Sequence, residues 1–324
     1  MRAVLVEDIG GPEVLRLTDV EAPAPGPGDV RVAVRSIGVN FRDVAQRREA
    51  QADQPPPFVP GSDFAGDVVE VGAEVTSLRV GDRVVGVTLA GAYAEEVVAP
   101  AAVVQPIPDD VSYDMAASLP VAGLSASFLL SSSGLRAGDT AVTWAAAGGL
   151  GCFLGGALAA AGVRTIGITS SEAKAEVARA AGHADVVDYT RADPVEAVLG
   201  LTGGQGAHVV FDSVGGPDFA RSVRMLRNEG TVVVCGRAAG EPDIGAAAAD
   251  LVGARRNRGL RDFYLATHVF DHLDEVPGRL AALAAGVATG ALVVPITGYP
   301  LADARRAHEE MEAGRTVGKL VLRP

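Results

Sequence analysis

Hydrophobic residues in the first hundred positions come in short runs that are separated by turns. The runs predict strands at residues 4–6, 15–17, 30–34, 67–71 and 82–87. Proline and glycine gather between two of them, at 23–28, and single glycines stand near the ends of the others. Short strands at spacings of roughly ten residues are typical of a small β-barrel or sandwich. We therefore expect a β domain in this part of the chain.

Beyond about residue 112 the pattern changes to apolar strands that alternate with helices rich in alanine and arginine. The strands are predicted at 141–144, 165–168, 185–187, 208–211 and 231–234, and the helices at 150–161, 171–181 and 218–227. Continuous apolar strands that alternate with helices are typical of a doubly wound parallel sheet. A helix from Asp303 to about Ala313 and a strand at 319–322 follow. The predicted fold class is α/β, a β domain combined with a parallel-sheet domain.

Length and charge narrow the class of protein. A chain of 324 residues is long enough for two domains. Its 28 basic and 40 acidic side chains give a net charge of −12, which argues against binding nucleic acid or an anionic membrane surface. No apolar run reaches the roughly 20 residues of a membrane span, and acids come too early for a signal peptide. We expect a soluble, cytoplasmic protein.

A glycine-rich turn between a predicted strand and a predicted helix is the strongest local motif. It reads Ala145–Gly151, with Gly148, Gly149 and Leu150 at its centre. Glycines there allow a tight turn and let a pyrophosphate approach the backbone N–H groups of the helix N-terminus. A plain structural turn is the alternative. The strand before and the helix after favour dinucleotide binding.

The end of the next strand indicates which dinucleotide is bound. An NAD site usually has an acidic residue there, which holds the ribose 2′-hydroxyl. Here Ser170 and Lys174 stand instead, with Glu172 as the nearest acid. A hydroxyl and a cation suit a 2′-phosphate, so NADPH is the predicted cofactor. Ser170 could equally cap the following helix.

Seven motifs together resemble the quinone oxidoreductase (zeta-crystallin-like) branch of the medium-chain dehydrogenase/reductase superfamily. They are Gly38–Asp43, Pro60–Gly66, Val80–Val84, Ala145–Gly151, Thr169–Lys174, Phe211–Gly216 and Gly318–Leu322. The resemblance implies a GroES-like catalytic domain made of residues 1–117 and 259–324, with a Rossmann domain at 118–258. It also implies a homodimer.

The sequence lacks the ligands of the zinc-dependent members of this superfamily. Asn40 and Ser62 stand where those enzymes have Cys and His, and neither is a usual zinc ligand. His268 and His272 have a spacing that can place two ligands on one helix face, but a solvated face is the favoured interpretation. The two cysteines, Cys152 and Cys235, are interpreted as small buried hydrophobic residues. No catalytic metal is predicted.

Without a Lewis acid, hydride transfer suits acceptors that take hydride readily, such as quinones and conjugated enones. The resemblance places Asn40 and Asp43 on the segment that lines the pocket. Asn40 is predicted to hydrogen-bond near the nicotinamide or the substrate oxygen. Asp43 has two possible roles, a catalytic one and a favoured one in which it only holds this segment. Asp63 replaces the family's commoner Glu, which leaves its role open.

The resemblance also assigns further cofactor contacts. Ser125 is placed near the ribose and Tyr189 near the adenine or the 2′-phosphate. Trp144 is interpreted as a core residue that lies near the adenine. The remaining assigned residues are Ser213, Val214, Gly236, Arg237 and Lys319.

Two other functions stay open. The motif Asn40–Val44 is also similar to enoyl reductase domains of modular polyketide synthases, which suggests an enoyl-thioester (CoA or carrier-protein) reductase. The four arginines between Arg255 and Arg261 would favour such an anionic substrate if they lay at the substrate mouth. Against it, no tyrosine occurs between Phe41 and Tyr93, where some of those domains place a proton donor. A non-enzymatic NADPH-binding protein is the third possibility.

Overall fold

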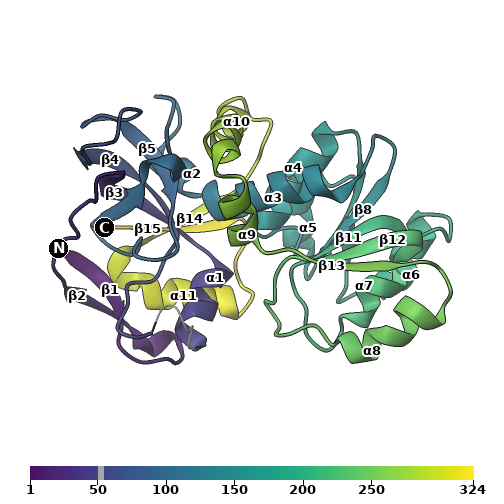
Figure 1. Cartoon of the computed structure of the whole chain (residues 1–324). Helices are drawn as coiled ribbons and strands as arrows, with labels where there is room; N and C mark the ends of the chain where they lie inside the picture. Colours follow the sequence, from purple (N-terminus) through teal and green to yellow (C-terminus); the bar gives the residue numbers. More distant parts are fainter. Residues whose placement is uncertain (50–54) are drawn as a thin grey trace. The chain divides into compact units, whose positions relative to one another are not determined.

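Unit 1 of the structure is built from both ends of the chain and unit 2 from its middle (Figure 1). The structure is a computed structural model, and it describes residues 1–49 and 55–324. Unit 1 comprises Met1–Ser125, His268–Ala291 and Pro295–Pro324, and unit 2 comprises Ala126–Thr267 and Leu292–Val294.

Seven strands form the main sheet of unit 1, in the order β14-β15-β3-β4-β5-β7, with β6 paired to β3. All its pairs are antiparallel except β14–β15. A separate antiparallel pair is formed by β1 and β2. The bounds are β1 Arg2–Val6, β2 Leu15–Asp19, β3 Asp29–Val39, β4 Asp63–Val71, β5 Arg83–Val87, β6 Glu96–Pro100, β7 Val104–Pro106, β14 Ile296–Pro300 and β15 Lys319–Arg323.

The core of unit 1 is filled by the alternating apolar side chains of these strands, such as Val30, Val32 and Phe64, each fully buried. Helices border this sheet. Their bounds are α1 Phe41–Arg48, α2 Tyr113–Ala117, α10 Val276–Ala288 and α11 Ala304–Glu312, while α3 Pro120–Ser133 and α9 Leu265–Asp271 run from one unit into the other. Single helical turns occur at Pro12–Val14, Ala101–Val103, Leu273–Glu275 and Leu301–Asp303.

Unit 2 is a six-stranded parallel sheet in the order β10-β9-β8-β11-β12-β13. The strands are β8 Thr140–Thr143, β9 Arg164–Thr169, β10 Asp185–Asp188, β11 Ala207–Asp212, β12 Leu226–Val234 and β13 Gly259–Asp262. The helices are α4 Gly149–Ala160, α5 Glu172–Ala180, α6 Pro194–Leu201, α7 Ala220–Arg224 and α8 Ile244–Ala248, followed by a π-helical segment Ala249–Gly253. The predicted doubly wound parallel sheet is confirmed.

One predicted helix and the strand after it in unit 2 have the wrong bounds. The helix predicted at 218–227 is shorter, and β12 begins at Leu226, five residues before the predicted start at 231. Leu226 is fully buried and pairs with Ala207 across a register shift in the sheet. Burial and strand pairing therefore override the helical pattern at this point.

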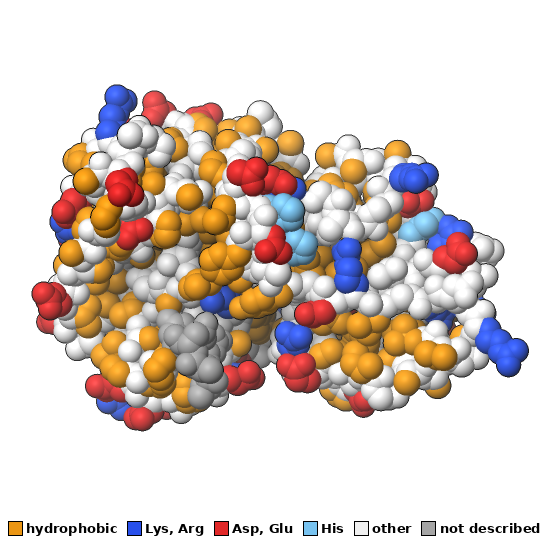
Figure 2. Space-filling model, viewed as in Figure 1, with side chains coloured by type: hydrophobic (Ala, Val, Ile, Leu, Met, Phe, Trp, Pro, Cys, Tyr) orange, Lys and Arg blue, Asp and Glu red, His pale blue; other side chains and the backbone are white. Residues whose placement is uncertain are grey.

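No helix in the described part of the chain is long and apolar enough to cross a membrane. On the face drawn in Figure 2, acidic and basic side chains are interspersed among hydrophobic ones. The coloured residues of that face form no continuous basic surface of the kind that binds nucleic acid.

Candidate functional site

The predicted cofactor residues of unit 2 lie at one edge of its sheet. Because all the strands run parallel, their carboxyl ends meet at the same edge, where ligands bind in sheets of this type. Gly148, Gly149 and Leu150 follow β8, Ser170 and Lys174 follow β9, Tyr189 follows β10, Ser213 and Val214 follow β11, and Gly236 and Arg237 follow β12. The structure thus brings these predicted residues together.

The glycine turn after β8 has the tight geometry that phosphate binding needs. Ala145 adopts a left-handed conformation with φ of 51°, and Gly148 caps α4 with an extended backbone. A Cβ on Gly151 would lie 2.5 Å from the Ala145 carbonyl oxygen, so only glycine fits there. The N–H groups of the first turn of α4 have no partner within the helix and can bind an anion.

The hydroxyl and the cation after β9 are held together. Lys174 Nζ donates to Ser170 Oγ at 3.1 Å. Ser171, and not Ser170, caps α5, because its Oγ accepts from the Lys174 backbone N–H at 3.3 Å. The alternative of Ser170 as the helix cap is therefore wrong. Partial burial lowers the pKa of Lys174.

The acid nearest to this cation is neutralised by other partners. Glu172 forms an ion pair with Arg179 at 2.9 Å and lies 4.0 Å from Arg191. Its charge is therefore offset by these arginines. Ser170 and Lys174 thus present a cationic, hydrogen-bonding edge that suits a phosphate better than a ribose hydroxyl.

An aromatic pair lies at the same edge. The rings of Trp144 and Tyr189 have centroids 6.2 Å apart and are tilted by 49°. Trp144 Nε1 donates to Ser222 Oγ at 2.7 Å, which donates to Asp212 Oδ2 at 2.6 Å. Trp144 is anchored by these bonds, while Tyr189 is 45 % exposed and can stack on a ligand.

The loops after β11 and β12 pack tightly. A Cβ on Gly236 would lie 2.7 Å from the Ser213 carbonyl oxygen. Arg237 forms ion pairs with Glu241 at 2.9 Å and with Asp262 at 3.4 Å. Gly236 is therefore required for close packing, and the charge of Arg237 is already balanced.

The second set of predicted residues forms a buried polar cluster in unit 1. Strand register sets the start of β4 and the start of β15 beside the end of β3. Lys319 Nζ donates to Asn40 Oδ1 at 2.6 Å, to Val39 O at 3.0 Å and to Asp63 Oδ2 at 3.2 Å. Asn40 Nδ2 donates to Asp63 Oδ2 at 2.9 Å, and Val121 N donates to Asp63 Oδ1 at 2.9 Å. These bonds fix the orientation of the Asn40 amide.

Burial disfavours the charge on Asp63, which has no exposed surface, and raises its pKa. The Lys319 ammonium and the Asn40 amide act in the opposite direction, since both favour the ionised carboxylate.

The predicted contact of Lys319 with a cofactor phosphate stays a prediction, and the structure engages its ammonium group within unit 1. Its three ammonium hydrogens are all donated within unit 1, and it is only 3 % exposed. Ser125 is also buried, on α3 in unit 1. Its contact with the ribose stays a prediction.

Asp43 holds the start of α1. Its Oδ2 accepts from the Asn40 backbone N–H at 2.8 Å and from the Tyr93 hydroxyl at 3.0 Å. Asp43 has no exposed surface, and burial raises its pKa to about 7. The geometry thus matches the holding role rather than contact with a substrate.

Sequence reasoning missed Arg42, which lies beside Asn40. Arg42 NH1 donates to Ser62 Oγ at 2.9 Å and to Leu89 O at 2.6 Å, which fixes the guanidinium. Phe41 and Leu89 are large hydrophobic residues that remain 44 % and 47 % exposed. Only the motif around Asn40 could have signalled Arg42, because no periodicity marks it.

The cluster around Asn40 does not fit a zinc ion. An ammonium group lies within it, and Asp63 is its only usual zinc ligand. The rings of His268 and His272 are stacked, with their centroids 6.3 Å apart. His272 Nδ1 lies 3.4 Å from Glu275 Oε1. Within residues 1–49 and 55–324, no group of three or more His, Cys, Asp or Glu side chains could hold a metal.

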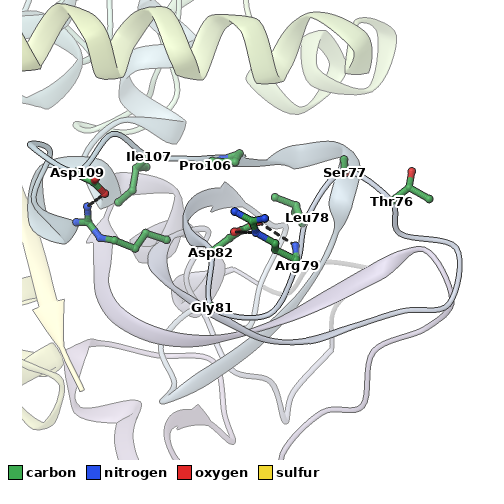
Figure 3. Close-up of a pocket in the computed structure, with 10 residues that line it drawn as sticks. Thr76, Ser77, Leu78, Arg79, Gly81, Asp82, Pro106, Ile107 and Asp109 are labelled. Atoms are coloured by element: carbon green, nitrogen blue, oxygen red, sulfur yellow. Dashed lines mark hydrogen bonds and ion pairs between the residues drawn. The ribbon is translucent and has the colours of Figure 1, made fainter.

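Unit 1 also has a hollow on its surface, which is lined by residues between 76 and 83 and between 106 and 109 (Figure 3). Its charged side chains are already paired, Arg79 with Asp82 at 3.1 Å and Arg83 with Asp109 at 3.7 Å. None of the predicted site residues lines it. We assign it no role.

The first two arginines of the arginine segment lie away from the predicted cofactor residues of unit 2. Arg255 and Arg256 line a pocket with Arg227 and Gln205. Gln205 precedes β11, Arg227 is the second residue of β12, and Arg255 and Arg256 precede β13. They therefore lie at the amino edge of the sheet, opposite the edge of the glycine turn. Arg255 and Arg256 therefore give no support to an anionic thioester substrate bound at the edge of the glycine turn.

Comparison with known proteins relates the whole chain to one family of enzymes. Residues 26–109 match the alcohol dehydrogenase GroES-like domain, and residues 181–322 match the zinc-binding dehydrogenase family. A quinone oxidoreductase of Pseudomonas aeruginosa is 37 % identical over 97 % of both chains. A 2-haloacrylate reductase of a Burkholderia species is 33 % identical over 99 % of this chain and 98 % of its own. The structure of Escherichia coli quinone oxidoreductase complexed with NADPH is 29 % identical, with a TM-score of 0.92 and full coverage of both chains.

Replacing Lys319 by Met should destabilise the protein by roughly 3–5 kcal/mol, because it leaves the buried Asp63 carboxylate without its cation. The change is measured by urea unfolding. Arg2→Met is the control: its ion pair with Glu95 is exposed, and its loss should cost less than about 1 kcal/mol. Equal losses in both variants would contradict the assigned role of Lys319.

Proposed function

Because the chain belongs to the quinone oxidoreductase branch of the medium-chain dehydrogenase/reductase superfamily, we propose that it reduces a small quinone or conjugated enone. The resemblance predicted from its motifs is confirmed by this membership. The proposal depends above all on the Asn40–Asp63–Lys319 cluster, which supplies fixed hydrogen bonds and one cation but no metal site.

The chain is an NADPH-dependent oxidoreductase. The residues at the carboxyl edge of unit 2 fit NADPH: the first turn of α4 suits the pyrophosphate, and Ser170 with Lys174 suits the 2′-phosphate. A non-enzymatic binding protein is set aside, since relatives that match nearly the whole chain are named oxidoreductase and reductase.

The surface beside Asn40 indicates the class of acceptor. Phe41 and Leu89 expose apolar surface there, and the Arg42 guanidinium is held in place by Ser62 and the Leu89 carbonyl. A flat apolar molecule with a carbonyl oxygen would pack on the two hydrophobic residues and accept a hydrogen bond from Arg42. Quinones and conjugated enones have both features.

Reduction adds a hydride and a proton to the acceptor, and NADPH supplies the hydride when it is bound. The residues of unit 1 orient and polarise the acceptor. Lys319 and Asp63 hold the Asn40 amide so that, among the described residues, the second Nδ2 hydrogen has only a long, 3.5 Å contact with Gly38 O. That hydrogen and the N–H groups of Arg42 can stabilise the negative charge that develops on the acceptor oxygen.

An enoyl-thioester reductase remains the alternative because of the motif Asn40–Val44. Arg255 and Arg256 lend it no support, because they lie at the other edge of unit 2.

The substrate class is tested by following NADPH oxidation with a simple para-quinone, a conjugated enone and a short enoyl-CoA. We expect turnover of the quinone or the enone and little turnover of the enoyl-CoA. The opposite preference would replace the proposal by the thioester alternative.

Lys174→Ala should weaken NADPH binding by at least about tenfold, since a hydrogen bond to a charged group is worth roughly 1.5–3 kcal/mol. NADH binding should hardly change, because NADH has no 2′-phosphate. Both are measured by fluorescence titration. Arg136→Ala is the control. It also removes one positive charge, but Arg136 precedes β8 and so lies at the other edge of the sheet. Equal losses for both cofactors would refute the assignment.

We infer further that the enzyme is a cytoplasmic homodimer. Strand β13 ends the order of the unit 2 sheet, and its Leu260 is 40 % exposed, so a second copy can pair along this edge. Both cysteines are free, as in proteins of a reducing compartment.

Light scattering should give a mass near twice the 32.9 kDa of the chain. Leu260→Glu should lower that mass toward the monomer, because it introduces a charge into the contact. Val80→Glu, at an exposed apolar residue of unit 1, should not. A monomeric wild-type protein would contradict the inference.

A further inference from the structure

A chain of buried hydrogen bonds leads from α11 to Asp43, which holds the start of α1. The Tyr93 hydroxyl lies 3.0 Å from Asp43 Oδ2 and 2.9 Å from His308 Nε2. Arg47 Nε donates to His308 Nδ1 at 3.2 Å, and Arg47 NH2 pairs with Glu312. Tyr93, His308, Arg47 and Asp43 have no exposed surface.

The chemistry of the groups sets the direction of every bond in this chain. Arginine has only donors, so His308 Nδ1 must be an acceptor, and neutral His308 carries its proton on Nε2. His308 therefore donates to the Tyr93 oxygen, and Tyr93 donates its single proton to Asp43. Burial and the nearby Arg47 and Arg48 lower the pKa of His308 to about 3, which keeps the ring neutral.

The Tyr93 ring cannot shift easily, so its hydroxyl stays aimed at Asp43. A Cβ on Gly61 would lie 2.1 Å from Tyr93 Cδ1, which shows how closely the backbone packs against the ring. The receiving oxygen, Asp43 Oδ2, also accepts the Asn40 backbone N–H. The position of Asn40 thus depends on Asp43 Oδ2, which Tyr93 and His308 hold.

We propose that Tyr93 and His308 are positioning residues for Asn40, acting through Asp43. This inference rests on the proposed function, in which Asn40 orients the hydride acceptor. Tyr93 and His308 are buried behind Asn40 and touch neither substrate nor cofactor in this account.

The proposal makes the site sensitive to the protonation of Asp43. Its Oδ1 is buried and, among the described residues, has no hydrogen-bond partner. No hydrogen bond from these residues to Oδ1 therefore favours either the protonated or the ionised carboxyl group. Ionised Asp43 accepts both hydrogen bonds on Oδ2 more strongly than the neutral acid does. The charged and titratable groups that face this carboxyl or its partners are Tyr93, His308, Arg47, Asp63, Lys319 and Arg42.

The test compares Tyr93→Phe, which keeps the ring and removes the hydroxyl, with the wild-type protein. Loss of a donor to the carboxylate disfavours its ionised form. We expect the kcat to fall about tenfold, the KM for NADPH to stay unchanged, and the acid limb of the kcat profile to move to higher pH. Tyr113→Phe is the matched control, because Tyr113 donates to Asp67 in the same unit but outside this chain of bonds.

A second pair of variants tests His308 and covers the case in which Tyr93→Phe does not fold. His308→Gln can still accept from Arg47 and donate to Tyr93, so it should retain most of the activity. His308→Leu can do neither and should resemble Tyr93→Phe. Equal activity of the Gln and Leu variants would overturn the role of His308.

A readout that needs no turnover separates this inference from the proposed function. In protein labelled with 13C at the aspartate carboxyls, Asp43 is assigned by its absence in Asp43→Asn. Its titration should move to higher pH in Tyr93→Phe and stay in place in Tyr113→Phe. An unmoved titration in Tyr93→Phe would overturn the inference. If the titration moves but the wild-type protein reduces no acceptor, only the proposed function is refuted.

Discussion

The buried ion pair of Asp63 and Lys319 is the interaction on which the candidate site depends. Two charges removed from water cost more than their attraction returns unless further hydrogen bonds satisfy them. Here Asn40, the Val39 carbonyl and the Val121 N–H supply those bonds. The pair therefore joins β3, β4, β15 and the start of α3, and it fixes the Asn40 amide as a consequence.

The two units contribute different parts of the chemistry. Unit 2 presents the free N–H groups of α4 and the Ser170–Lys174 pair at the carboxyl edge of its sheet, which suits a phosphorylated dinucleotide. Unit 1 presents a fixed amide and a fixed guanidinium beside exposed apolar side chains. In the function we propose, directional hydrogen bonds take the role that a metal ion has in other dehydrogenases, and the acceptors are molecules that take hydride readily.

Patterns along the chain could predict the residues at the sheet edge but not the interior of unit 1. Parallel strands share one edge, so the residues that follow them are found from the strand pattern alone. The sequence pattern does not predict helix α1, because three of its four buried residues are polar and give no apolar repeat of helical spacing. These buried residues are Asp43, Val44, Gln46 and Arg47. The sequence alone does not show that Lys319 meets Asn40, because this contact follows from the register of β15 against β3. The bonds of Tyr93 and His308 join residues 215 positions apart and leave no local signal.

The central claim is that Lys319 acts through Asn40, and a double-mutant cycle on kcat/KM tests it most directly. The cycle needs Asn40→Ala, Lys319→Met and the double variant, assayed with the preferred acceptor under one set of conditions. If Lys319 orients the amide, the double variant loses little more than Asn40→Ala alone, with a coupling energy of about 1 kcal/mol or more. Losses that simply add would show that the two residues act independently and would contradict the account.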